Sequence, residues 1–243
     1  DDGSMDALIL PRPTSFVPNS LVLRQGVAAS SRMALVTGPN VGGKTVYIAS
    51  VAMAVMLHQM GALVPAERAS LPLFDAVVAR MGSTESMLGG TSSFAGEMAQ
   101  TRLALHAATP RSLVIFDEVG RGTTAVEGCG IAFGVVRELL RRGCCGLVAT
   151  HFHELAALED EERRSAPLDG GSGGTSASAA DSVLDPPHHT PIYNLHTSAI
   201  MAPPPVATSS AATAMAPNRV VRLTYSVARG ANADSLGLEI AAA

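Results

Sequence analysis

The chain is almost free of lysine. Sixteen of its 17 basic side chains are arginine, and Lys44 is the single lysine among 243 residues. Coding bias in a GC-rich genome explains the arginines. It does not explain the exception, because an ammonium is a compact point charge and some phosphate sites accept no guanidinium in its place. Lys44 is therefore the first candidate functional residue.

Charge of either sign is also scarce. Charged residues make up 16% of the chain, hydrophobic residues make up 47%, and the formal net charge is −4. So little basic charge argues against a nucleic-acid-binding module that relies on a basic surface. The apolar content argues against disorder over the whole chain and allows a core of ordinary size. We expect a single α/β domain over residues 1–243.

The three cysteines are too few, and wrongly spaced, for a zinc site or a disulfide framework. Cys129 stands alone and Cys144 adjoins Cys145, so we expect free thiols in a reducing compartment inside the cell. A basic targeting leader is not expected either, because Asp1, Asp2 and Asp6 make the start acidic.

The longest uncharged run does not have the character of a membrane span. Residues 46–64 carry no charged side chain, but they are rich in alanine, include His58, Gln59 and Gly61, and start close to Lys44. These features favour a buried helix of a water-soluble domain, and we expect no membrane partner.

Short apolar runs alternate with longer helical patterns along the chain. We predict strands at 21–23, 33–37, 77–81, 112–116 and 146–150, and helices at 46–64, 97–108 and 126–142. Strands that alternate with helices indicate a mainly parallel sheet with right-handed crossovers.

Composition changes after Arg164. Gly, Ser, Ala, Thr and Pro dominate as far as residue 217, with a glycine-rich run at 170–174 and three prolines at 203–205. This composition predicts two low-complexity, disordered insertions at 163–189 and 201–217. Between them, residues 191–199 have a strand-like pattern, and regular structure is expected again at 220–227.

The single lysine lies in a phosphate-loop motif, G-x-x-x-x-G-K-[ST]. The motif consists of Gly38, Pro39, Asn40, Val41, Gly42, Gly43, Lys44 and Thr45. Glycines let backbone N–H groups close around phosphate oxygens, and the following helix directs its positive end at the same anion. Lys44 is expected to neutralise the β- and γ-phosphates of a nucleotide, and the Thr45 hydroxyl to bind Mg²⁺.

Two carboxylates and a histidine follow later apolar strands. Asp117 and Glu118 end the run at 113–116, and His151 ends the run at 146–150. Asp117 is expected to hold Mg²⁺, partly through water, and Glu118 to orient or deprotonate the attacking water. His151 is expected to hydrogen-bond the γ-phosphate, although a capping or structural role is the alternative.

These motifs together resemble a known family. TGPNVGGKT, GGTSSFAGEM, SLVIFDEVGRGTT and ATHFHEL, spread over residues 33–158, are similar in order and spacing to the MutS mismatch-repair ATPases, which belong to the ABC-type ATPase superfamily. The resemblance implies a three-layer P-loop NTPase fold and ATP with Mg²⁺ as ligands. The chain departs from the pattern at Gly96, where the family has an aliphatic residue.

The resemblance adds two site residues and a mechanism. Phe16 corresponds to an aromatic residue that stacks on adenine, although a core residue is an equal reading. Ser92, with Ser93 as a rival, corresponds to a serine that reaches the γ-phosphate of the opposite subunit. One chain would then not complete a site, and ATP would join two domains until hydrolysis releases them.

The expected function is ATP binding and hydrolysis in a DNA mismatch-repair protein, with a second MutS-type subunit as partner. Mismatched DNA would be contacted through domains outside this chain, and a MutL-type partner is possible. Two alternatives stay open: a nucleotide-gated dimerisation module without useful turnover, and the ATPase of a recombination-related MutS or a Rad50-like protein. The nucleus, a mitochondrion and a plastid all fit the expected intracellular location.

Overall fold

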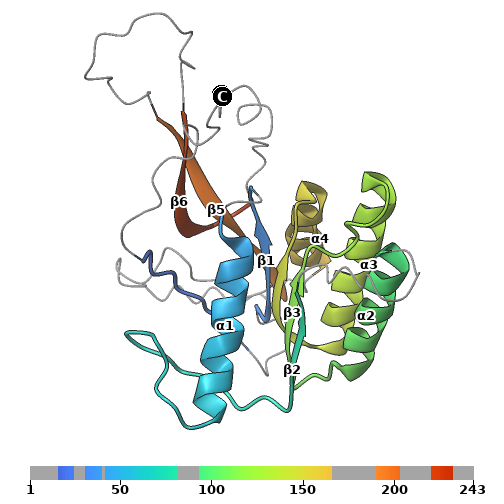
Figure 1. The fold of residues 1–243 in the computed structure, drawn as a ribbon. Helices are drawn as coiled ribbons and strands as arrows, with labels where there is room; N and C mark the ends of the chain where they lie inside the picture. Colours follow the sequence, from blue (N-terminus) through green and yellow to red (C-terminus); the bar gives the residue numbers. More distant parts are fainter. Residues whose placement is uncertain are drawn as a thin grey trace, which may run out of the picture.

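The computed structural model describes residues 16–24, 31–39, 42–81, 93–165, 190–202 and 220–231. A six-stranded sheet organises them, in the order β2-β3-β4-β1-β5-β6 (Figure 1). The strands are β1 (Met33–Thr37), β2 (Val77–Arg80), β3 (Leu113–Asp117), β4 (Cys145–Ala149), β5 (Ile192–Ala202) and β6 (Val220–Arg229). All neighbours pair in parallel except β5 and β6, which are antiparallel.

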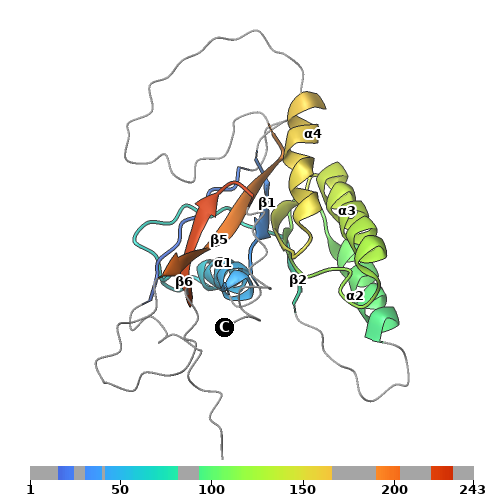
Figure 2. The ribbon, with the colours of Figure 1, turned by 90° about the horizontal axis from the view of Figure 1, so that it is seen from above.

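Helices cover both faces of the sheet. They are α1 (Lys44–Gln59), α2 (Ser93–Ala107), α3 (Ala125–Arg142) and α4 (Ala157–Ser165), with a short 3₁₀ helix, η2 (His153–Ala156), before α4. Figures 1 and 2 show α1 on one face and α2, α3 and α4 on the other. The predicted three-layer α/β architecture is therefore confirmed.

The continuous apolar runs form the strands because the central strands are buried on both faces. All five residues of β1, β3 and β4 are buried. Their side chains alternate between two cores. Met33 and Leu35 pack in the core under α3, whereas Ala34 and Val36 pack in the core that contains Ile48 of α1.

The register of the parallel pairing aligns the carboxyl ends of β1, β4 and β3. Val36 and Asp117 are each paired with Ala149 of β4, one from either side. The backbone continues this alignment, because Thr150 N–H donates to Val36 O and Glu118 N–H donates to Ala149 O. In open parallel sheets, ligands bind outside the carboxyl ends of the strands. The phosphate loop, Asp117, Glu118 and His151 lie at or after these three ends.

Two of the predicted elements need correction. Residues 21–23 form no strand. Val22 O accepts instead from the Tyr193 hydroxyl, and O of the preceding Ser20 accepts from the Tyr47 hydroxyl. The helix predicted at 46–64 ends at Gln59, before Gly61, whose φ is 75°. It is also only half-buried, because a single sheet face covers it. Met53, Met56 and Met60 are exposed.

The edges of the low-complexity segments also differ from the prediction. Residues 163–165 belong to α4, and Met201 and Ala202 belong to β5. The remainder of both predicted insertions lies outside the described residues. Among the described helices, none has the length and apolar character of a bilayer span.

The cysteines give a prediction of their own. Cys144 and Cys145 are buried, whereas Cys129 is partly exposed, and all three are free thiols. Burial raises the pKa of all three, and that of Cys145 to about 12. Because the thiolate is the nucleophile, we expect Cys144 and Cys145 to resist alkylation at pH 8 until the protein unfolds. Quantitative thiol labelling with and without guanidinium measures this; equal labelling of all three thiols in the native state would contradict it.

Candidate functional site

The phosphate-loop motif forms a turn between β1 and α1. Gly43, with φ at 88°, occupies the N-cap position of α1, and Lys44 is the first residue of the helix. The Lys44 side chain is 2% exposed, and its Nζ donates to Gly38 O at 2.7 Å and to Pro39 O at 3.2 Å. Carbonyl groups of the loop therefore surround the Lys44 ammonium group. Asn40 and Val41 lie outside the described residues.

At two positions of the loop, a neighbouring side chain leaves no space for any residue larger than glycine. A Cβ atom on Gly38 would lie 2.3 Å from Thr197 Oγ1, and one on Gly42 would lie 2.5 Å from the same atom. Thr197 belongs to β5, whose preceding residue His196 is in register with Thr37 of β1. Its Oγ1 is buried without a hydrogen-bond partner. No local sequence pattern marks Thr197, because only the pairing of β5 with β1 brings it to the loop.

Thr45 and Asp117 meet across the site. Thr45 Oγ1 donates to Asp117 Oδ2 at 2.8 Å, and Asp117 Oδ1 is buried with no hydrogen-bond partner. An unpaired carboxylate oxygen beside a hydroxyl fits a hard cation such as Mg²⁺, which binds few protein ligands and completes its shell with water and phosphate. The described residues contain no cluster of three or more His, Cys, Asp or Glu that could hold a metal. The fit therefore rests on this pair.

Burial sets the electrostatics of the site. Desolvation raises the pKa of Asp117, although the Thr45 hydrogen bond partly opposes the shift. Desolvation also lowers the pKa of Lys44, opposed by the negative charges of Glu118 and Asp117. Both charged forms lose hydration, so each depends on an opposite charge nearby. A bound anion and cation would supply these charges.

Glu118 follows Asp117 in a strained backbone conformation. Its φ is 49°, a left-handed value that costs a residue with a side chain about 1–2 kcal/mol. The carboxylate is 16% exposed, and its Oε1 lies 4.0 Å from Lys44 Nζ. Its Oε2 accepts from Arg121 Nη1 at 2.9 Å. The structure therefore places this carboxylate beside the phosphate-loop lysine.

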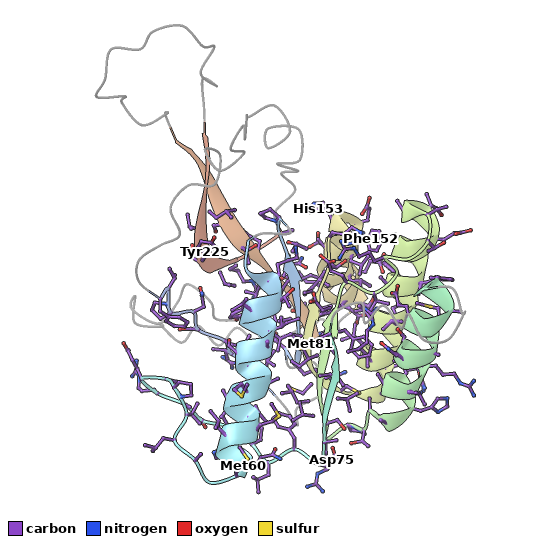
Figure 3. All side chains as sticks on the ribbon, viewed as in Figure 1. Met60, Asp75, Met81, Phe152, His153 and Tyr225 are labelled. Atoms are coloured by element: carbon purple, nitrogen blue, oxygen red, sulfur yellow. The ribbon has the colours of Figure 1, made fainter. Side chains whose placement is uncertain are left out.

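His151 comes two residues after the end of β4. The ring is half-buried and lies against Phe152, with 4.1 Å between the ring centroids. Desolvation lowers the pKa of His151, opposed by the charge of Glu118, so the imidazole is neutral at pH 7. A neutral imidazole can donate one hydrogen bond and accept another. Figure 3 shows the following residues, Phe152 and His153, at the end of the sheet where α1 begins and far from Met60.

Two aromatic side chains line the groove that borders the phosphate loop. Phe16 is 85% exposed, so it is not a core residue. It lines a groove with Gly43, Thr45 and Tyr225. Tyr225, at the start of α1 in Figure 3, has φ at 56°, and a Cβ on Gly43 would lie 3.3 Å from its ring. Sequence reasoning missed Tyr225, whose nearness to the loop depends on the β5–β6 pairing.

The segment that carries Phe16 is tied to β6. Asn19 Nδ2 donates to Tyr225 O at 3.0 Å, and Val227 N–H donates to Asn19 Oδ1 at 2.7 Å. These two bonds fix the segment beside the loop. Ser92, the serine expected to act on a second subunit, lies outside the described residues, which resume at Ser93, the first residue of α2.

The parallel sheet, the loop and the carboxylate at the end of β3 define an α/β protein of the P-loop ATPase-like class. A family model described as MutS domain V matches residues 34–169. That is more than half of the chain, and the chain belongs to the MutS family. The match covers the described site residues from Gly38 to His151.

Curated relatives agree with this assignment. The chain is 44% identical over 150 residues to "DNA mismatch repair protein MutS" of Thermus thermophilus, which covers 62% of the chain and 18% of the relative. It is 40% identical over 148 residues to "DNA mismatch repair protein msh-2" of Neurospora crassa, which covers 60% of the chain and 16% of the relative. The chain therefore spans less than a fifth of the length of these relatives.

Proposed function

We propose that this chain binds and hydrolyses ATP as the ATPase domain of a MutS-type DNA mismatch-repair protein. The observation that carries the proposal is the arrangement of Lys44, Thr45, Asp117 and Glu118 around one phosphate loop. Lys44 is buried in the loop, Thr45 bonds Asp117, and Glu118 lies within 4.0 Å of Lys44 Nζ. Phosphoryl transfer requires this combination of positioning and charge.

Each residue has a distinct part in the proposed reaction. Backbone N–H groups of the loop and of the start of α1 bind phosphate oxygens, and Lys44 exchanges its two carbonyl partners for the β- and γ-phosphates. Thr45 and Asp117 would hold Mg²⁺, which neutralises phosphate charge when bound. Phe16 stacks on adenine, and Tyr225 offers a second aromatic face beside Gly43.

Hydrolysis itself is assigned to Glu118 and His151. Glu118 takes a proton from water as the water oxygen attacks the γ-phosphorus, and the bridging oxygen leaves with ADP. His151, neutral at pH 7, hydrogen-bonds the γ-phosphate and senses its release. The alternative, a dimerisation module without turnover, is disfavoured by Glu118, because a base beside the phosphates has no use in such a module. The match to MutS domain V disfavours a Rad50-like protein.

ATP is proposed to join two such domains and thereby to control a DNA clamp. The second subunit, alike or different, would supply Ser92 to the γ-phosphate. Mismatched DNA would be held by parts of the protein outside this chain, which itself carries a net charge of −4. A MutL-type partner, and a nuclear or organellar location, are proposed on the family resemblance alone.

Mixing two inactive variants tests the shared site. Ser92→Ala keeps its own Lys44, and Lys44→Ala keeps its own Ser92. We expect each variant alone to be inactive and the mixture to regain about a quarter of the wild-type ATPase rate, because random pairing makes half of the dimers mixed and each mixed dimer has one complete site.

Phosphate release measures the recovery, and sedimentation with and without ATP measures the dimer. Ser93→Ala, the rival serine, is the matched control and should hydrolyse ATP normally. A mixture that stays inactive although sedimentation shows mixed dimers would exclude action in trans.

A further inference from the structure

A buried ion pair borders the site; it joins an arginine outside the motifs to a glutamate within GGTSSFAGEM. Arg80 is the last residue of β2, and Glu97 lies in the first turns of α2. Their side chains are 6% and 9% exposed, and Arg80 Nη2 lies 3.3 Å from Glu97 Oε1. Replacement of a buried ion pair by apolar residues is often neutral for stability, so stability alone does not account for it.

The pair contacts the backbone on both sides of Glu118. Arg80 Nη1 donates to Asp117 O at 2.5 Å. Glu97 Oε1 accepts from Gly120 N–H at 2.6 Å, and Glu97 Oε2 accepts from Gly122 N–H at 3.2 Å. One arginine and one glutamate thus fix the peptide groups that precede and follow the carboxylate proposed as the base.

Glu118 needs such support. Its φ of 49° is rarely adopted by a residue with a side chain, and conformations of this kind persist where the surroundings hold them. The Glu118 N–H is bonded to Ala149 O, which fixes one peptide group. The ion pair fixes the carbonyl of that same peptide group through Arg80, and the N–H groups of Gly120 and Gly122 through Glu97.

We infer that Arg80 and Glu97 are positioning residues that hold the Glu118 carboxylate at the phosphate loop, and that through Glu97 they couple the orientation of α2 to that carboxylate. The inference rests on the proposed ATPase function. It implies that a movement of α2 is transmitted to Glu118. Whatever moves α2, including a second subunit docked at the start of that helix, also moves the backbone around Glu118. An arginine is required because its planar fork reaches Asp117 O and Glu97 together, which an ammonium cannot do.

The test variant is Glu97→Gln, which keeps the shape and removes the charge. We expect faster hydrogen exchange at the amides of residues 118–124 and a loss of about 100-fold in the ATP hydrolysis rate, because small misplacements of catalytic groups have effects of this size. ATP affinity should stay at its wild-type value, whereas the melting temperature should fall, because the buried Arg80 cation loses its partner. A purely structural role would instead change ATP affinity together with the rate, and exchange would not rise selectively at residues 118–124.

Glu161→Gln is the matched control. Glu161 pairs with Arg137 at the surface, with side chains 40% and 55% exposed, and its replacement should change neither exchange nor hydrolysis. Arg80→Lys is the second variant, expected to retain the fold and to show the same two changes. Wild-type exchange and hydrolysis in Glu97→Gln would overturn the inference. Failure of the ATPase proposal would appear separately, as wild-type protein that neither binds nor hydrolyses ATP.

Discussion

Lys44→Ala is expected to abolish ATP binding. The wild-type Nζ is buried and already makes two charge-assisted bonds to loop carbonyls, so the cation is held where phosphate oxygens would replace those carbonyls. Loss of two such bonds corresponds to at least about 100-fold in affinity. Isothermal titration with ATP and Mg²⁺ measures the change.

Two further variants make this result specific. Lys44→Arg keeps the charge, but the pocket around Nζ is closed by Gly38 and Pro39, and a planar guanidinium does not fit the same place. It should also fail to bind. Arg111→Ala removes an exposed cation from the turn before β3 and should bind ATP normally. Unchanged affinity in Lys44→Ala would remove the phosphate loop from the proposed function.

Glu118→Gln is expected to separate binding from hydrolysis. The amide keeps the volume of the side chain and cannot accept a proton from water. General-base catalysis contributes about 10²–10⁴-fold, and the hydrolysis rate should fall by that amount. ATP then persists, so sedimentation should show dimers that outlast those of the wild type.

Glu127→Gln is the matched control for this variant. Glu127 lies in the first turn of α3, is exposed and bonds Thr123, so it shares the neighbourhood but not the contact with Lys44. Single-turnover phosphate release measures both variants. Wild-type turnover in Glu118→Gln would exclude Glu118 as the base and would favour a different residue for that step.

The residues at strand ends could be predicted from the sequence. A buried strand is recognised as an apolar run, and the first polar residue after the run marks its end. Asp117 and His151 were found in this way, and registry of β1, β3 and β4 then aligned their strand ends. Lys44 needed no pairing information, since the loop motif is local.

Residues that act through tertiary contacts gave no comparable signal. Thr197 lies near the loop only because β5 pairs with β1. In the sequence Arg80 is an ordinary residue at a strand end, and its role depends on the ion pair with Glu97. The predicted strand at 21–23 failed for the same reason. Leu21 and Leu23 do pack partly against a core, but Val22 O accepts from the hydroxyl of the distant Tyr193 and not from a neighbouring strand.

The alignment of the carboxyl ends of β1, β4 and β3 has a consequence for how the protein folds. Lys44, Asp117 and His151 are separated by 73 and 34 residues in the chain, and only parallel pairing of non-adjacent segments brings them together. Such pairing is slow, because loop closure must precede any gain from contact. A ligand that binds this assembly and not the unfolded chain stabilises it by about 2.7 kcal/mol at a hundredfold excess over Kd. A nucleotide bound at the proposed site would therefore favour folding of the domain, apart from any part in the proposed hydrolysis.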